Sequence, residues 1–168
     1  MHRLHKRLIF CVFITMAFGT LLLVNYIKQE HSTDLSKLSI NRVKIGSEIN
    51  IDEYVEQDEV ILKKYRLYLK REHPNLIFKV NKKDPRLKGI TLTNDITVQT
   101  NFNGTINNNV GKVTQILGTR YKQKKLRKGF NAIIYKDKKN QIKLYIIYKH
   151  DKIKKVEIYK KKLKMTFL

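Results

Sequence analysis

Apolar and polar positions follow a strand-like pattern in the last third of the chain. Three runs, residues 130–135, 142–148 and 152–159, hold alternating or clustered aliphatic and aromatic residues, which is typical of β-strands. The breaks between them, residues 137–140 and 150–151, consist of Asp, Lys, Asn and His, which favour turns. These runs predict an antiparallel three-stranded meander.

A second group of strands is predicted nearer the middle of the chain. Residues 76–80 and 87–92 are apolar, and the segment between them, residues 81–85, is Asn-Lys-Lys-Asp-Pro. Such a connection between two apolar runs predicts a β-hairpin.

Two segments carry helical signals. In the first, Asp52 is suited to cap a helix whose early acids and late bases match the helix dipole, and Pro74 is suited to close it. In the second, residues 109–117, apolar residues recur on one helical face and Gly118 can end the helix. With the strands, these segments predict an α+β domain in which short helices pack on an antiparallel sheet.

The longest apolar run lies near the start of the chain. Residues 8–27 carry no charge over twenty positions, which is the length that a helix needs to cross a bilayer, whereas residues 1–7 hold three bases and no acid. This pattern predicts a single-pass transmembrane anchor with the N-terminus in the cytoplasm and the remainder outside the cell membrane. A cleaved signal peptide is the alternative, because Ala17-Phe18-Gly19 resembles a cleavage site.

The rest of the chain divides into a polar tether, residues 28–42, and one basic extracytoplasmic domain, residues 43–164. The only cysteine is Cys11, so the predicted domain has no disulfide. A small exported domain without disulfides is ordinary for a Gram-positive bacterium and unusual for an animal secreted protein.

Charge is distributed unevenly along the chain, whose formal net charge is +22. Residues 28–100 hold 14 basic and 11 acidic residues, whereas residues 101–168 hold 19 basic and 3 acidic residues. A cationic surface with interleaved tyrosines attracts polyanions. The alternative is that the lysines only cover a solvated face and protect edge strands. The candidate polyanion-binding residues are Lys124, Lys125, Arg127, Lys128, Lys152, Lys154, Lys155, Tyr145 and Tyr159.

One pattern occurs twice in the chain. Arg86 to Leu92 and Lys152 to Ile158 both read base, aliphatic, Lys, any residue, aliphatic, any residue, aliphatic. Each follows a strand and a charged turn. The match predicts two tandem helix-plus-strands repeats, residues 43–93 and 100–160.

A family resemblance rests on residues 100–121, TNFNGTINNNVGKVTQILGTRY, together with the meander after them. This segment resembles a unit of small extracytoplasmic helix-plus-antiparallel-sheet domains of low-GC Gram-positive bacteria. More distantly, it resembles the units of β-lactamase inhibitor proteins, which can be fused in tandem. The resemblance implies a binding or scaffolding module and carries over no functional residues. Gly104 departs from the pattern, because Thr-Ile-Asn-Asn-Asn follows it in place of the usual helix entry.

Residue types that carry catalysis are sparse after the apolar run. No cysteine is present there, the four serines lie outside any nucleophile elbow, and His31, His73 and His150 lack the spacing of metal ligands. We therefore expect no enzymatic activity, no cofactor and no metal site.

The sequence favours a membrane-anchored, non-catalytic binding module whose basic face binds anionic cell-wall polymer or anionic lipid. The alternative is an accessory or inhibitor-like subunit that docks on another membrane or exported protein. Nucleic acid is an unfavoured partner, because a domain outside the membrane seldom meets it. The biological process, the identity of the ligand and the oligomeric state do not follow from the sequence.

Overall fold

The structure is a computed structural model that describes residues 14–16, 19–20, 32–58 and 62–160. The chain forms two compact units, Met1–His31 and Ser32–Leu168. In the first unit the described residues are α-helical, and Thr20 Oγ1 donates a hydrogen bond of 3.1 Å to the Met16 carbonyl. The second unit contains the β-sheet and, with it, the candidate site.

The predicted membrane anchor requires correction. Within the described parts of the chain, no helix combines the length and the apolar character needed to cross a bilayer. Of the uncharged run 8–27, the structure describes residues 14–16 and 19–20, which are helical. The rest of that run and residues 1–7 lie outside the described residues. The single-pass anchor, its orientation and the cell-membrane localisation are therefore not supported.

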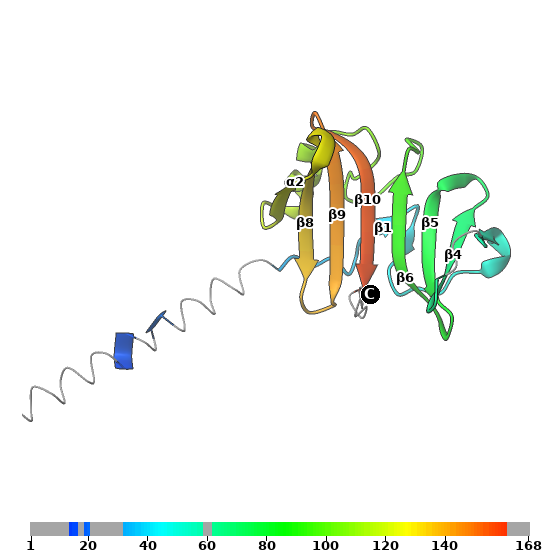
Figure 1. Ribbon diagram of the computed structural model, residues 1–168, viewed down its shortest axis with the longest axis horizontal. Coiled ribbons are helices and arrows are strands. Elements are labelled where there is room, and N and C mark those ends of the chain that lie inside the picture. The colour runs from blue at the N-terminus through cyan, green and yellow to red at the C-terminus, as the bar shows by residue number, and fades with distance from the viewer. Residues whose placement is uncertain (1–13, 17–18, 21–31, 59–61, 161–168) are drawn as a thin grey trace, which may run out of the picture. The chain divides into compact units, whose positions relative to one another are not determined.

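Eight strands form one antiparallel sheet in the order β3-β4-β5-β6-β10-β9-β8-β7 (Figure 1). The strands are β3 (Tyr54–Glu56), β4 (Tyr65–Lys70), β5 (His73–Asn81), β6 (Asp84–Thr93), β7 (Lys122–Lys125), β8 (Asn131–Asp137), β9 (Ile142–Lys149) and β10 (Lys152–Lys160). A separate hairpin pairs β1 (Ser39–Ile40) with β2 (Val43–Lys44). The remaining elements are the helix α2 (Val110–Leu117) and the 3₁₀ turns η1 (Ile51–Glu53) and η2 (Arg127–Gly129).

Five predicted strands and one predicted helix are confirmed. The runs at 76–80 and 87–92 lie in β5 and β6, which form the expected hairpin. The three later runs form β8, β9 and β10, which pair as the expected meander. The second predicted helix is α2, where the side chain of Asn109 accepts a hydrogen bond from the Gly111 N–H and Gly118 ends the helix.

The α+β fold class is wrong, because the first predicted helix does not form. Its residues instead form η1, β3 and β4, and Pro74 lies inside β5. Charges at helix ends contribute only about 0.3–1 kcal/mol each. In β4, Tyr68 is 2% exposed and pairs with Phe78, and burial of an aromatic side chain outweighs the contribution of those charges. The described unit is therefore mostly β-sheet with a single two-turn α-helix.

One face of the sheet, the covered face, builds the core. Leu76 and Phe78 of β5 and Leu144 and Ile146 of β9 are fully buried on it. The covering layer consists mainly of non-helical chain before β3 and between β6 and β7. Its buried residues are Leu35, Leu38, Ile40, Val98, Phe102, Ile106 and Val113, the last of which belongs to α2.

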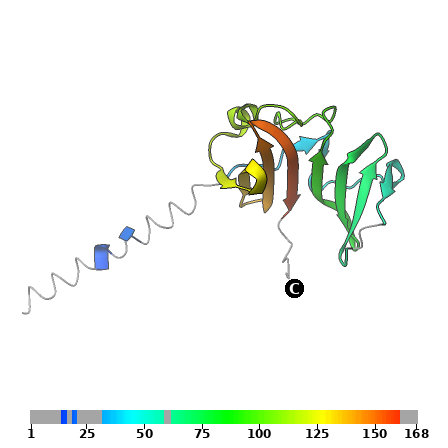
Figure 2. The same cartoon turned by 45° about the horizontal axis from the view of Figure 1, so that its top comes forward.

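The sheet divides into a first half, β3 to β6, and a second half, β7 to β10, which meet where β6 pairs with β10. Figures 1 and 2 show the cyan and green strands on one side and the yellow to red strands on the other. The two segments that share a sequence pattern are these two central strands, with Leu92 opposite Val156 and Ile90 opposite Ile158. All four side chains lie in the core. The shared sequence pattern thus falls on two paired strands. The predicted pair of helix-plus-strands repeats is wrong, because the described residues of the first half form no α-helix.

The opposite side of the sheet is called the open face. Adjacent strands place a row of residues on it, all of which are half-buried. This row consists of Leu69, Ile77, Thr91, Glu157 and Tyr145. Because side chains alternate between the two faces of a strand, these residues point away from the core.

Candidate functional site

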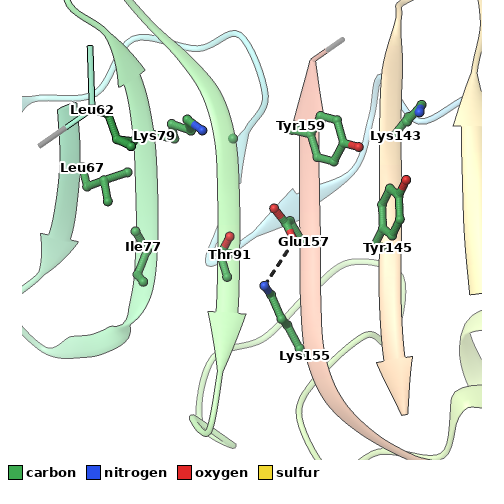
Figure 3. Close-up of a pocket in the computed structure, with 11 residues that line it drawn as sticks. Leu62, Leu67, Ile77, Lys79, Thr91, Lys143, Tyr145, Lys155, Glu157 and Tyr159 are labelled. Carbon is green, nitrogen blue, oxygen red and sulfur yellow. Dashed lines mark ion pairs between the residues drawn. The ribbon is translucent and has the colours of Figure 1, made fainter. Parts of the chain in front are cut away.

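A groove of about 620 Å³ crosses the middle of the open face (Figure 3). Its lining residues come from β4, β5, β6, β10 and β9, and one more, Leu62, precedes β4. The groove therefore spans the boundary between the two halves of the sheet, and residues from both halves contribute to it.

Strand register determines which side chains meet in the groove. Lys79 pairs with Gly89, Gly89 pairs with Tyr159, and Tyr159 pairs with Lys143. These four residues form one row across four neighbouring strands. Neighbouring strands are about 4.8 Å apart, so the backbones of Lys79 and Lys143 are separated by about 14 Å. Two ammonium groups thus flank a central glycine and tyrosine.

Gly89 forms part of the floor of the groove. A Cβ atom at this position would lie 3.4 Å from Lys79 Cβ and 3.6 Å from Tyr159 Cβ, which are ordinary van der Waals distances. A side chain would therefore fit sterically at its base, and its outer atoms would project into the groove. The absence of a side chain leaves a gap on β6 between the lysine and the tyrosine.

Two tyrosines form the aromatic wall of the groove. The rings of Tyr145 and Tyr159 stack with centroids 5.7 Å apart and planes 20° apart. Burial, and then the hydrogen bond with Tyr145, raises the pKa of Tyr159. The Tyr159 phenol is therefore neutral at physiological pH, and it contributes aromatic surface and a hydroxyl group to the wall without negative charge.

The charge of the groove is positive. Lys79, Lys143 and Lys155 line it, and Glu157 is the one acid among the lining residues. Lys155 Nζ lies 3.2 Å from the Glu157 carboxylate, as the dashed line in Figure 3 marks. Lys79 Nζ lies 4.7 Å from the centre of the Tyr65 ring, a cation–π contact that orients the ammonium group beside the groove.

The structure separates the candidate residues that the sequence groups together. Tyr145, Tyr159 and Lys155 lie in the groove. Lys124 belongs to the edge strand β7 and pairs with Ala132 of β8, which places its side chain on the open face. The adjacent Lys125 points to the other side of the sheet.

The remaining candidates lie away from the groove. Arg127 and Lys128 are in the turn η2 between β7 and β8. Lys152 begins β10, and Lys154 Nζ donates a hydrogen bond of 3.0 Å to Asn107 in the covering layer. The predicted residues are therefore divided between the groove and other parts of the surface.

Sequence reasoning missed Lys79, Gly89 and Lys143. Each lies inside a correctly predicted strand, and its position relative to the apolar residues places it on the face opposite the core. The alternation of apolar and polar residues along these strands therefore indicates that the three residues lie on the open face. The pairing of β6 with β10, which brings the three residues into one row, joins strands about sixty positions apart and leaves no local mark in the sequence.

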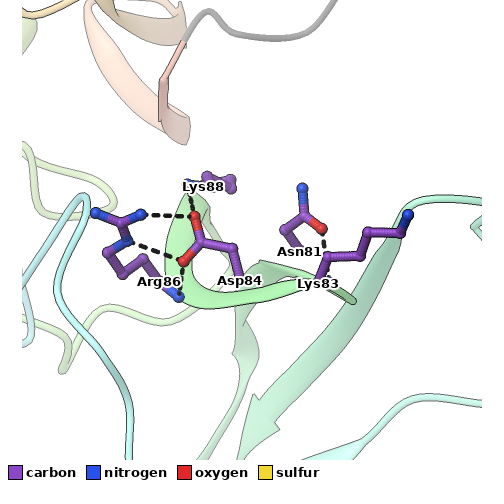
Figure 4. A network of polar contacts seen from close by, with 5 residues as sticks. All are labelled: Asn81, Lys83, Asp84, Arg86 and Lys88. Atoms are coloured by element: carbon purple, nitrogen blue, oxygen red, sulfur yellow. Dashed lines mark hydrogen bonds and ion pairs between the residues drawn. The ribbon is translucent and has the colours of Figure 1, made fainter.

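A second polar cluster lies at the β5–β6 turn and has a different character (Figure 4). The Asp84 carboxylate accepts hydrogen bonds from Arg86 Nε at 2.9 Å and from Lys88 Nζ at 2.7 Å. The hydrogen bonds from Arg86 and then from Lys88 hold the Asp84 pKa far below its ordinary value. Because one carboxylate engages both cations, this cluster is a less suitable anion site than the groove.

Comparison with known proteins finds no family model, no curated protein and no solved structure that matches this chain. Among the described residues, no three or more His, Cys, Asp or Glu side chains gather where they could hold a metal ion. The groove itself is therefore the basis for assigning a function.

Proposed function

We propose that this protein is a non-catalytic binding module that binds a polyanion through the groove on its open face. The observation that carries the proposal is the row of Lys79, Gly89, Tyr159 and Lys143, with Lys155 beside it. Three ammonium groups and one carboxylate line a half-buried surface. Partial burial makes such charges interact with a ligand more strongly than charges in bulk water do.

The overall charge supports the same ligand class. A net charge of +22 attracts any polyanion at long range, and this attraction weakens as salt screens it. The groove adds a particular place where the attracted chain would be held. If only the overall charge matters, removing lysines anywhere on the protein should weaken binding equally. If the groove holds the ligand, removing the lysines of the groove should weaken binding more.

The test measures binding of the full-length protein to inorganic polyphosphate at several salt concentrations. Replacing Lys79, Lys143 and Lys155 with Gln is expected to weaken binding at low salt by about tenfold or more, and to reduce the slope of log K against log salt by about 2–3. The control replaces Lys83, Lys112 and Lys139, which do not line the groove. Equal losses in the two triple variants would reject the groove and leave only the general charge of the protein.

A protein partner is a second candidate, favoured by the apolar part of the open face. Leu67 and Ile77 line the groove, and Val55 of the edge strand β3 is 44% exposed. Apolar contacts persist at high salt, whereas polyanion binding is lost. A discrete protein that stays bound at high salt, combined with no binding to polyphosphate, would select this candidate. This candidate corresponds to the alternative expected from the sequence, an accessory or inhibitor-like subunit that docks on another protein.

A further inference from the structure

We infer that the polyanion is a single-stranded nucleic acid, with a base stacked against Tyr159 above Gly89 and phosphates on the flanking lysines. This inference rests on the proposed function and adds a requirement, because the ligand must carry planar rings as well as negative charge. The reasons are the shape of the groove, the arrangement of its charges and the position of the sheet edges.

The shape of the groove leaves room for a planar group beside the two tyrosines. Tyr145 and Tyr159 already stack on each other, and Figure 3 shows the Tyr159 ring directed toward β9, away from β6. On the β6 side, the neighbouring residue in register is Gly89, which has no side chain. A planar group that lies on the outer face of the Tyr159 ring can therefore extend over Gly89 without displacing a neighbouring side chain on β6.

The charges lie on both sides of that gap. Lys79 stands on one side of Gly89, and Lys143 stands beyond Tyr159 on the other side. A nucleic acid strand alternates bases with phosphates, so one that inserts a base between these lysines presents phosphates to both. Stacking on aromatic side chains combined with lysine contacts to the backbone is how proteins hold single strands with little dependence on sequence.

An acidic peptide fits this groove less well. It would bring no regular series of rings to the gap above Gly89. Extended peptides usually bind to sheets by adding a strand at an edge. The edges of this sheet are β3 and β7, and neither contributes a residue to the groove.

The unfavoured status of nucleic acid depended on an extracytoplasmic position of the domain. The assignment of a nucleic acid rests on the chemistry of the groove, whose lysines, stacked tyrosines and open gap at Gly89 match a chain of alternating phosphates and bases.

The experiment compares three probes of equal charge, measured by fluorescence anisotropy with the full-length protein at one salt concentration. They are an oligothymidylate, an abasic chain with the same number of phosphates, and a polyglutamate peptide. We expect the oligothymidylate to bind about tenfold more tightly than the abasic chain, which corresponds to about 1.4 kcal/mol. We expect the polyglutamate to bind no better than the abasic chain.

Two variants examine the gap itself. Gly89→Val fills the floor while keeping every charge, and Tyr159→Leu removes the stacking surface. Both are expected to reduce the preference for bases to about twofold or less, with binding of the abasic chain nearly unchanged. Tyr121→Leu is the matched control, because Tyr121 packs against Tyr135 on the covered face. Thermal melting of each variant verifies that it folds, and Gly89→Ala, which adds only the Cβ atom, replaces Gly89→Val if the larger side chain unfolds the sheet.

The outcomes separate this inference from the proposed function. Equal binding of the oligothymidylate and the abasic chain would overturn the nucleic acid assignment and leave the polyanion site intact. Tighter binding of polyglutamate would overturn it in favour of an acidic protein segment. Failure of all three probes, and of polyphosphate, would overturn the proposed function as well.

Discussion

The two halves of the sheet have the same strand order but present different surfaces. Each is a run of four antiparallel strands, and the two runs meet at β6 and β10. On the open face the first half presents mainly apolar residues, Leu67, Leu69 and Ile77, with Lys79 beside them. The second half also presents apolar residues, Ile134 and Ile147, and adds Lys143, Lys155 and the stacked tyrosines. Matching backbones thus carry different mixtures of side chains, and the groove lies where the two halves meet.

The covered face differs between the halves as well. Behind the second half lies α2, whose Val113 is fully buried and whose end is held by a hydrogen bond of 2.7 Å from Tyr135 Oη to the Gly118 carbonyl. Among the described residues, the first half has no helix in the corresponding position, although the same kind of sheet lies in front of it. A regular sheet can therefore be covered by irregular chain as long as apolar side chains fill the core.

The largest expected effect comes from the junction of the halves. Leu92 is fully buried and lies between Leu76 and Val156, so Leu92→Ala leaves a cavity shared by both halves. Urea denaturation should show a loss of about 2–5 kcal/mol in the free energy of unfolding. Leu69→Ala, on the half-buried open face, should cost clearly less. Equal losses would mean that the two faces do not differ in burial as described.

A smaller effect is expected at Asp137 in the second half. The residue is 3% exposed, and its carboxylate accepts hydrogen bonds from the Leu35 N–H at 2.9 Å and from the Asn140 N–H at 2.8 Å. It thereby ties the covering segment to the β8–β9 turn. Asp137→Ala should lower the free energy of unfolding by about 2 kcal/mol, because buried donors lose their partner. Asp52→Ala, at an exposed position in η1, is the control.

The effect of Asp137 should depend on pH. Desolvation alone would raise its pKa, but the hydrogen bonds from Asn140 and Leu35 bring the pKa below the ordinary value of 3.8. A lowered native pKa means that the ionised group stabilises the fold above pH 3.8 and that this contribution is lost as the pH falls through the native value. The stability difference between the wild-type protein and Asp137→Ala should therefore be constant near neutral pH and shrink in acid. A difference that grows in acid would contradict this account.

A third effect is expected at Tyr135, whose hydrogen bond holds the end of α2, the helix found only behind the second half among the described residues. Burial raises the pKa of Tyr135, so its hydroxyl stays protonated and available as a donor to Gly118. Tyr135→Phe keeps the ring and removes the hydrogen bond, and should cost about 1 kcal/mol. Amide exchange should increase in α2 before it increases in β5 or β6. Uniform exchange across both halves would show that the helix is not held locally.

The smallest effect is expected at the edge of the first half. Val55 of β3 is 44% exposed, so Val55→Thr should change the free energy of unfolding by no more than about 0.5 kcal/mol. The substitution also removes an apolar contact from the open face. If it abolishes capture of a protein partner at high salt without changing polyphosphate binding, the second candidate function gains direct support.

Several elements could be predicted from local patterns. The strands β5, β6, β8, β9 and β10 follow from apolar runs bounded by turn residues, and α2 follows from helical spacing with Asn109 and Gly118 at its ends. The segment around β4 could not be predicted from local patterns. Its acids come early and its bases late, as in a helix, but its tyrosines and leucines pack as a strand. Pairing with β5 decided its conformation, and that partner lies outside the local pattern.

The candidate site shows the same division. Lys155, Tyr145 and Tyr159 were found because bases and aromatic residues are concentrated near the C-terminus. Lys79 and Gly89 lie in the hairpin of the first half, and they reach the groove only because β6 pairs with β10. The net charge of a sequence indicates a class of ligand. To identify which side chains form a row across the sheet, the register between the strands must be known.

By itself, the sequence determined the positions of five of the ten described strands, the helix α2, the strongly basic character of the chain and the turns between the later strands. These properties depend on neighbours within a few residues, where alternation, capping and turn preference act. The tertiary structure decided the strand character of residues 54–56 and 65–70, the meeting of the two halves and the composition of the groove. These depend on contacts between residues distant in the chain, whose burial contributes more free energy than local preference does.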